Sequence, residues 1–321
     1  MNRRLGILRN GVIALGVVLL SLAHASRAAD RMNICLNWAP GADHAPLYFA
    51  RSQGWFADIG LATTLQAGGG SADALRKLSD GECDAAIADF NAFPAGSPRP
   101  PLAVFAIFLD SPLAFYAIAP RKLDSLADLR NVSIGADPRE LARRLWPTLT
   151  ARDPSAGQEV RWVELPNNAK VDALASGLAD IVANSFYHHA VEFARTFGPT
   201  LQVMHWRDHG VNPYSNVLAV SVDTAVASPD MTGRLVQVVQ RAYRACVREV
   251  RPCLDALMAA NPHLDRDAES AKWEVAAPLV APSRLSGQII GFFDPGRIEG
   301  GAAGPNPRYS NQFLAPVWQV P

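Results

Sequence analysis

The alternation of short apolar runs with helical segments constrains the fold of this chain more than any other feature. Residues 32–89 read as strand, helix, strand, helix and strand: "MNICLNW", "HAPLYFARSQ", "LATTLQA", "SADALRKLSDG" and "CDAAIAD". Gly54 is expected to end the first of these helices. Strands that alternate with helices are joined by crossovers, so they pair in parallel within a sheet that helices cover on both faces. The run "LAVFAIFLD" continues this unit. The sequence therefore predicts an α/β fold.

The same order restarts further along the chain. A helix in "LADLR" leads into the strand "NVSIGA", a helix begins at Asp137, and the strands "VRWVEL" and "ADIVANS" flank the helix "NAKVDALASGL". The stretches "LAFYAIAP" and "VNPYSNVLAVSVD" read as two extended hinge crossings. We expect two lobes, each a mainly parallel sheet flanked by helices: lobe 1 from residues 29–113 and 214–321, and lobe 2 from residues 114–213. Ligands of open α/β sheets bind beyond the carboxyl ends of strands, which predicts a site between the lobes.

The N-terminus has the pattern of an export signal. Arg3, Arg4 and Arg9 precede an uncharged apolar run at residues 11–23, and small residues frame a cleavage site after Ala28. The run is shorter than the roughly 20 residues that a spanning helix needs. We therefore predict a signal peptide over residues 1–28, with a retained signal anchor as the alternative. The mature chain is expected to be soluble and periplasmic, with no membrane insertion after cleavage.

Charge and cysteine content narrow the class of protein. The chain has 30 basic and 30 acidic residues, so it lacks the electrostatic footprint of a nucleic-acid-binding protein. At 49% hydrophobic residues it can bury a large core. Its four cysteines permit disulfides in an exported protein. Cys246 and Cys253 are close enough for a local bridge, since Pro252 breaks the helix between them, but four buried thiols are an equal alternative.

The first predicted strand ends in side chains suited to ligand binding. Trp38 offers a stacking face to a flat heterocycle, or else belongs to the core. Asp43 is a candidate ligand residue, or only the N-cap of the next helix. His44 is placed to donate to a ligand carbonyl or phosphate at the helix N-terminus. Tyr48 lies one turn later on the same face and fits the core as well.

A glycine turn forms the second candidate. Gly68, Gly69 and Gly70 precede Ser71, which reads as an N-cap, so exposed backbone N–H groups could hold an anion or a carboxamide. Simple turn chemistry explains the same pattern. Asp89 closes the third strand at the same predicted edge.

Lobe 2 contributes the segment "NSFYHH". Asn184 and Ser185 supply hydrogen bonds, while Phe186 or Tyr187 would form the opposing wall of an aromatic clamp. Tyr214 and Asn216, on the return crossing, are lesser candidates. "ADPRE" has the spacing of a capping box with Asp137 as N-cap. We predict no metal site, because "GVNP" follows "HWRDH" and disfavours the helix that would place both histidines on one face, and we predict no catalytic residues.

The segment "LNWAPGADHAPLYFARSQGWFADIGL" resembles the N-terminal signature of periplasmic solute-binding proteins related to the thiamine-pyrimidine precursor binders. "GGGSADALRKLSDGECDAAIAD", "VDALASGLADIVAN" and "SGQIIGFFDPGRI" are similar to later parts of that family, so the resemblance covers nearly the whole mature chain. Asn37 stands where many relatives have an acid, and the second-lobe segment reads "NSFYHHAVE" where they carry aromatics followed directly by an acid.

The resemblance implies a type II periplasmic binding fold. It also implies that the protein binds a small molecule, with Asn37 among the contacting residues, and delivers this ligand to the membrane permease of an ABC importer. It implies a monomer without cofactor and without enzymatic activity. Fungal relatives that synthesise the thiamine pyrimidine are the enzymatic alternative, but their cysteine-rich motif is missing and the export signal argues against such chemistry. Binding of sulfonate or nitrate anions is the other alternative.

Overall fold

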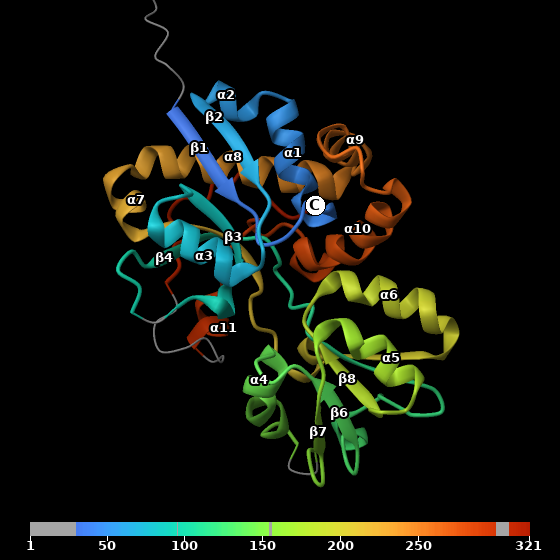
Figure 1. The fold of residues 1–321 in the computed structure, drawn as a ribbon. Helices are drawn as coiled ribbons and strands as arrows, with labels where there is room; N and C mark the ends of the chain where they lie inside the picture. The colour runs from blue at the N-terminus through green and yellow to red at the C-terminus, as the bar shows by residue number, and fades with distance from the viewer. Residues whose placement is uncertain (1–29, 95, 154–155, 300–307) are drawn as a thin grey trace, which may run out of the picture.

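Two five-stranded sheets, each covered by helices, divide the chain into two lobes (Figure 1). The structure is a computed structural model and describes residues 30–94, 96–153, 156–299 and 308–321. The signal peptide predicted over residues 1–28 lies outside these ranges. Among the described residues, no helix combines the length and the apolar character needed to cross a membrane.

The sheet of lobe 1 has the strand order β2-β1-β3-β10-β4. β1 pairs in parallel with β2 and β3, whereas β10 runs antiparallel to both β3 and β4. One strand therefore opposes the other four, as expected of a mainly parallel sheet. The bounds are β1 (Asp30–Cys35), β2 (Leu61–Gln66), β3 (Ala85–Asp89), β4 (Pro101–Ala106) and β10 (Asn216–Ser221).

The sheet of lobe 2 repeats this plan in the order β7-β6-β8-β5-β9. β6 pairs in parallel with β7 and β8, and β5 runs antiparallel to β8 and β9. The bounds are β5 (Ala114–Ile118), β6 (Ser133–Ala136), β7 (Arg161–Glu164), β8 (Ile181–Asn184) and β9 (Leu201–His205). The prediction of two α/β lobes with mainly parallel sheets is confirmed.

The two crossings between lobes are shorter than predicted. The whole stretch at residues 211–223 was expected to cross between the lobes, but residues 216–221 form β10, a fully buried strand inside the first sheet. Residues 113–120 similarly contribute β5 to the second sheet. A buried extended segment must pair its backbone groups, so these residues complete sheets instead of linking them. Asn212 joins the crossings, because its side chain donates to Asp110 and accepts from the Ser111 N–H.

The helices of lobe 1 come from both ends of the chain. Gly54, at φ 73°, ends the first helical segment as predicted. The long helix α8 buries an apolar face that includes Leu235, Val239 and Tyr243. The bounds are η1 (Ala42–His44), α1 (Ala45–Ser52), α2 (Trp55–Asp58), α3 (Ser71–Asp80), η2 (Phe90–Ala92), α7 (Val222–Ala227), α8 (Pro229–Arg248), α9 (Arg251–Ala260), α10 (Arg266–Val280), η7 (Ser283–Leu285) and α11 (Pro295–Glu299).

The helices of lobe 2 differ from prediction at two places. The capping box expected at Asp137 is not the start of a helix, because Glu140 has an extended backbone and α4 begins after it. The Glu140 carboxylate accepts from the Asp137 N–H, as in a capping box, but it also forms a buried ion pair with Lys170. The helix expected in "LADLR" is only a 3₁₀ turn. The bounds are η3 (Leu126–Asp128), α4 (Leu141–Thr150), η4 (Asn167–Ala169), α5 (Lys170–Ala175), α6 (Tyr187–Phe197), η5 (Gly198–Thr200) and η6 (Trp206–His209).

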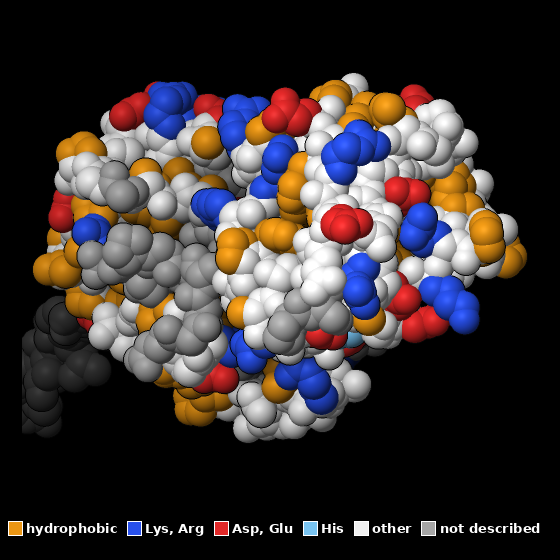
Figure 2. Space-filling view, turned by 90° about the horizontal axis from the view of Figure 1, so that it is seen from below, with side chains coloured by type: hydrophobic (Ala, Val, Ile, Leu, Met, Phe, Trp, Pro, Cys, Tyr) orange, Lys and Arg blue, Asp and Glu red, His pale blue; other side chains and the backbone are white. Residues whose placement is uncertain are grey.

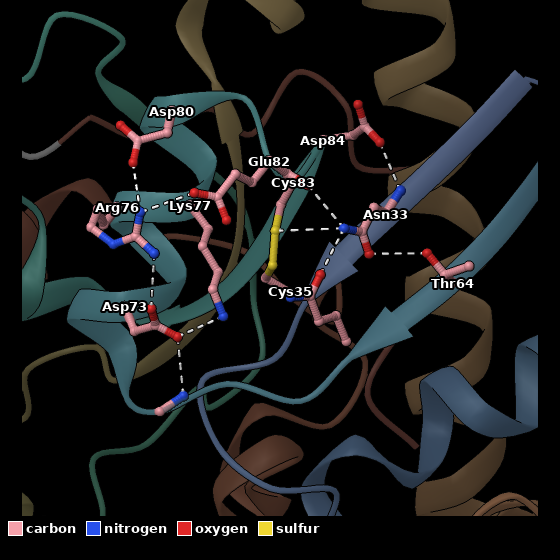
Figure 3. The surroundings of a disulfide bond; sticks show 12 residues. Asn33, Cys35, Thr64, Asp73, Arg76, Lys77, Asp80, Glu82, Cys83 and Asp84 are labelled. Atoms are coloured by element: carbon pink, nitrogen blue, oxygen red, sulfur yellow. Dashed lines mark hydrogen bonds and ion pairs between the residues drawn. A yellow bond between two sulfur atoms is a disulfide. The ribbon is translucent and has the colours of Figure 1, made fainter.

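All four cysteines form disulfides. Cys246–Cys253 joins the end of α8 to the start of α9, which settles the alternative between a local bridge and buried thiols. Cys35–Cys83, which the sequence did not reveal, ties the end of β1 to the residues leading into β3 (Figure 3). It therefore lies directly before the segment that contains Asn37 and Trp38.

Candidate ligand-binding site

The carboxyl ends of the parallel strands in both sheets point toward the junction between the lobes. The chain leaves lobe 1 after β4 and enters lobe 2 at the start of β5, where Ala114 pairs with Asn184, the last residue of β8. It returns after β9 to the start of β10, where Asn216 pairs with Asp89, the last residue of β3. Most of the predicted site residues therefore occupy two edges that face one another, and α10 and α6 come together beside them (Figure 1).

A buried polar network joins these two edges. Asp43 accepts a hydrogen bond from the Tyr187 hydroxyl of lobe 2 at 2.8 Å and another from the Asn216 amide at 3.2 Å. Both Asp43 and Tyr187 are at most 8% exposed. Burial raises the pKa of Tyr187 well above its ordinary value, and the Asp43 carboxylate adds to the shift. The phenol therefore stays protonated and donates to the carboxylate.

Asn37 and His44 extend the network within lobe 1. The Asn37 amide donates to Asn216 Oδ1 at 3.3 Å, and its Oδ1 lies 2.9 Å from His44 Nε2. His44 is 2% exposed and its Nδ1 has no hydrogen-bond partner. The prediction that Asp43 caps a helix is wrong: no side chain caps η1 or α1. Its carboxylate instead holds the two lobes together.

Two aromatic side chains beside this network are exposed. Trp38 in lobe 1 is 58% exposed and Phe186 in lobe 2 is 41% exposed. Trp38 lies three residues after the end of β1, and Phe186 lies two residues after the end of β8. The sequence left open whether Phe186 or Tyr187 forms the second wall of a clamp; of these two side chains, Phe186 is the exposed one. Tyr187 is buried against Phe108 and bonded to Asp43, so its ring face is not free.

The glycine turn is folded back on its own lobe. A Cβ atom on Gly68 would collide with the carbonyl oxygen of Leu36, so only glycine fits there. The Gly69 N–H donates to the carboxylate of Asp73 at 3.2 Å. A hydrogen bond from Lys77, followed by that from Gly69, lowers the pKa of Asp73. The position that an anionic ligand would take at this turn is therefore filled by a carboxylate of the chain.

Ser71 and Asp89 tie α3 to the end of β3. The Asp89 N–H donates to Ser71 Oγ at 2.9 Å, so Ser71 is not the N-cap predicted from the sequence; Gly70 holds that position. The Asp89 carboxylate accepts from the Asn91 amide and from Ser215 Oγ. Burial raises the pKa of Asp89. These contacts give both residues a role in positioning the edge of the sheet.

A second polar cluster lies at the edge of lobe 2. Asn184 is fully buried, donates to the Phe186 carbonyl at 2.8 Å and lies 2.9 Å from His189 Nδ1. Lys170 contacts both carboxylate oxygens of Glu140 at 2.8 Å. Burial raises the pKa of Glu140 and lowers that of Lys170, and the contact between them opposes both shifts. The edge of lobe 2 therefore carries balanced charge.

The model of the family described as NMT1/THI5 like matches residues 41–249, which is more than half of the chain. The chain belongs to the NMT1/THI5-like family. The matched range runs from Gly41, at the start of the polar network, through the whole of lobe 2 to the end of α8. It therefore includes both facing edges, apart from the strand-end residues Asn37 and Trp38.

Other comparisons agree with this membership. A formylaminopyrimidine-binding protein of Halalkalibacterium halodurans is 24% identical over 241 residues, which cover 74% of this chain and 72% of the relative. A periplasmic sulfonate-binding protein SsuA, described as putative, from Methylobacillus flagellatus KT superposes with a TM-score of 0.63 at 11% identity, covering 89% and 93% of the chains. The aliphatic sulphonate-binding protein SsuA of Escherichia coli gives 0.61 at 10% identity, covering 77% and 83%. These likenesses show that the chain has the periplasmic binding protein fold.

Two predicted site residues of this NMT1/THI5-like protein lie outside the facing edges. Tyr48 is 4% exposed in α1, which packs against α9, and burial raises its pKa. Tyr214 packs under the guanidinium of Arg297, and its hydroxyl accepts from the Asp294 N–H. Both side chains make these contacts within lobe 1, so they belong to its core. Ser185 is half-buried between Asn184 and Phe186.

Several residues of the site were not predicted as ligand contacts. Asn216 bridges Asn37 and Asp43, although the sequence marked it only as a lesser candidate. His189 is the partner of Asn184, and nothing in its sequence position distinguished it from His188. Among the described residues, no three His, Cys, Asp or Glu side chains come together as a metal site.

Proposed function

We propose that this chain is an exported, periplasmic solute-binding protein that captures a small, flat, polar heterocycle between its lobes. It then delivers the ligand to the membrane permease of an ABC importer. The proposed ligand is a thiamine pyrimidine precursor or a related ring. The H. halodurans relative supports this choice, since its name describes binding of a formylaminopyrimidine. The mature chain acts as a monomer and returns its ligand chemically unchanged.

The pair of exposed aromatic residues carries the proposal. Trp38 follows the end of β1 by three residues and Phe186 follows the end of β8 by two, beyond the carboxyl ends of strands where ligands of open α/β sheets bind. Large aromatic side chains are normally well buried, so two at one junction indicate surfaces that a bound molecule covers. A flat heterocycle offers each ring a stacking face.

The polar groups around this pair favour an uncharged ligand over a sulfonate or nitrate. At the glycine turn, the Gly69 N–H is taken by the Asp73 carboxylate. In lobe 2, the Asp137 N–H donates to Glu140 Oε2 at 3.3 Å, and Lys170 is paired with the same carboxylate. An anion would have to displace these carboxylates or lie beside them, at an electrostatic cost. Asn37 and the buried network offer amide groups to a neutral ring instead.

A thermal-shift series on residues 29–321 tests the proposal. The series contains an aminopyrimidine, a flavin, an alkanesulfonate and nitrate. A ligand that binds only the folded state, present at 100 times its dissociation constant, adds about 2.7 kcal/mol to the stability. We expect a shift with the aminopyrimidine and recovery of the same compound afterwards. A shift with sulfonate or nitrate alone would contradict the proposed ligand class, and turnover of the pyrimidine would replace binding with enzymatic activity.

A further inference from the structure

His189 occupies the edge of lobe 2 that faces lobe 1. It lies in the first turn of α6, which follows the last residue of β8, Asn184. Asn184 pairs with Ala114, the first residue of β5, where the chain arrives from lobe 1. The rings of His189 and the exposed Phe186 are 5.5 Å apart. The imidazole therefore stands beside the proposed aromatic wall.

Hydrogen bonds around Asn184 fix which nitrogen of His189 carries the proton. The Asn184 Nδ2 group donates to the carbonyl oxygen of Phe186, which leaves Oδ1 as an acceptor. Oδ1 lies 2.9 Å from His189 Nδ1. The hydrogen of a neutral imidazole must therefore be on Nδ1, and Nε2 presents a lone pair.

The surroundings of His189 keep the ring neutral. Burial, followed by the neighbouring His188 and Lys170, lowers its pKa to about 3. Lys170 is itself paired with Glu140, and burial lowers the pKa of His188. The imidazole is thus a neutral acceptor under ordinary conditions.

The Nε2 atom has no partner within the part of the chain that the structure describes. Its ring makes one hydrogen bond, through Nδ1. Among the described residues, Nδ1 of His44 and Nδ1 of His205 are buried without a hydrogen-bond partner, but Nε2 of His189 is not among these buried atoms. It is therefore an accessible acceptor of fixed orientation that lacks a donor.

We propose that His189 Nε2 accepts a hydrogen bond from an amino group on the rim of a heterocycle stacked against Phe186. This inference rests on the proposed function and adds a determinant of specificity to it. His189 selects a ring with an exocyclic N–H donor over the same ring with an acceptor at that position. An acceptor there, including a sulfonate oxygen, would meet the lone pair of Nε2 and leave both groups unpaired.

Isothermal titration with two matched pyrimidines tests the selection. The probes are 4-amino-5-hydroxymethyl-2-methylpyrimidine and its 4-methoxy analogue, which lacks the N–H donor. We expect the wild-type protein to bind the amino compound about tenfold more tightly, the value of one hydrogen bond. Equal affinities would overturn this inference and leave the proposed function standing. Binding of neither compound would overturn the proposed function and the inference with it.

Two substitutions separate the nitrogens of the ring. His189→Asn places an amide near Nδ1 and keeps the bond to Asn184, whereas His189→Gln extends an amide to the position of Nε2. We expect His189→Gln to keep the preference and His189→Asn to reduce it below about twofold. His263→Gln, on an exposed loop of lobe 1, is the control and should match the wild type. A preference that His189→Asn retains, or that both variants lose equally, overturns the assignment to Nε2; melting curves verify that each variant is folded.

Discussion

Trp38 is 58% exposed, so its ring contributes little to the packing of the core. We predict that Trp38→Ala weakens binding of an aminopyrimidine at least about 30-fold, as expected for an aromatic anchor worth about 2 kcal/mol. The unfolding free energy should change by less than about 0.5 kcal/mol, because the side chain is exposed. Calorimetric titration and urea unfolding measure the two quantities. Trp38→Phe keeps a stacking face and should bind nearly as well; wild-type affinity in Trp38→Ala would remove this residue from the site.

The low pKa of His189 predicts how the stability of the protein changes in acid. Its pKa is about 3 in the folded protein, below the ordinary value of about 6.5. The folded state therefore binds the proton less tightly than the unfolded state. The contribution of neutral His189 to the free energy of unfolding is present in full above about pH 6.5 and is lost as the pH falls toward 3. We predict that His189→Asn is less sensitive than the wild type to a change from pH 7 to pH 4. Urea midpoints at both pH values measure this difference. An equal fall of the midpoint from pH 7 to pH 4 in the two proteins would contradict the prediction.

The two disulfides, which join different elements of the fold, should contribute different amounts to the free energy of unfolding. Cys35–Cys83 spans 48 residues and Cys246–Cys253 spans 7. Chain entropy assigns about 4 kcal/mol to the longer loop and about 2 kcal/mol to the shorter one. We therefore predict that replacing the first pair by serine costs more unfolding free energy than replacing the second. Urea unfolding of the two double variants compares them, and a larger loss from the Cys246–Cys253 pair would contradict the entropic account.

Elements whose signals are local could be predicted from the sequence. Hydrophobic periodicity placed β1 and α3, and the glycine at position 54 marked the end of a helical segment. The predictions failed where a long-range partner overrode a local signal. Glu140 fits a capping box but pairs with Lys170, and Ser71 fits an N-cap but accepts from the Asp89 N–H. The pairing of Cys35 with Cys83 likewise depends on the neighbouring strands β1 and β3, which sequence spacing does not reveal.

At the scale of the whole molecule, the lobes are joined by their crossings and by the contact of Tyr187 with Asp43. Arg297 donates to the carbonyl oxygen of Leu109 on one crossing and to that of Asn212 on the other. These bonds hold the crossings together at one side of the junction. On the surface, basic and acidic side chains are intermixed across the face shown in Figure 2. The two-lobed plan was predictable from the repeated strand and helix order, but the contacts that close the lobes were not.

Removing the Tyr187 hydroxyl should loosen this contact. Tyr187→Phe leaves the buried Asp43 carboxylate without its donor from lobe 2, which costs about 1–3 kcal/mol of unfolding free energy. Urea unfolding measures the loss. Tyr309→Phe, in the C-terminal segment of lobe 1, is the matched control and should stay within about 0.5 kcal/mol of the wild type. Equal losses in the two variants would show that the contact between the lobes adds no stability.

The most direct test of binding between the lobes is calorimetric titration of the mature chain with 4-amino-5-hydroxymethyl-2-methylpyrimidine and, separately, with ethanesulfonate. The exposed Trp38 and Phe186, together with the carboxylates at the backbone N–H groups of both edges, predict heat of binding with the pyrimidine and none with the sulfonate. Binding of the sulfonate with no binding of the pyrimidine would contradict the proposed function.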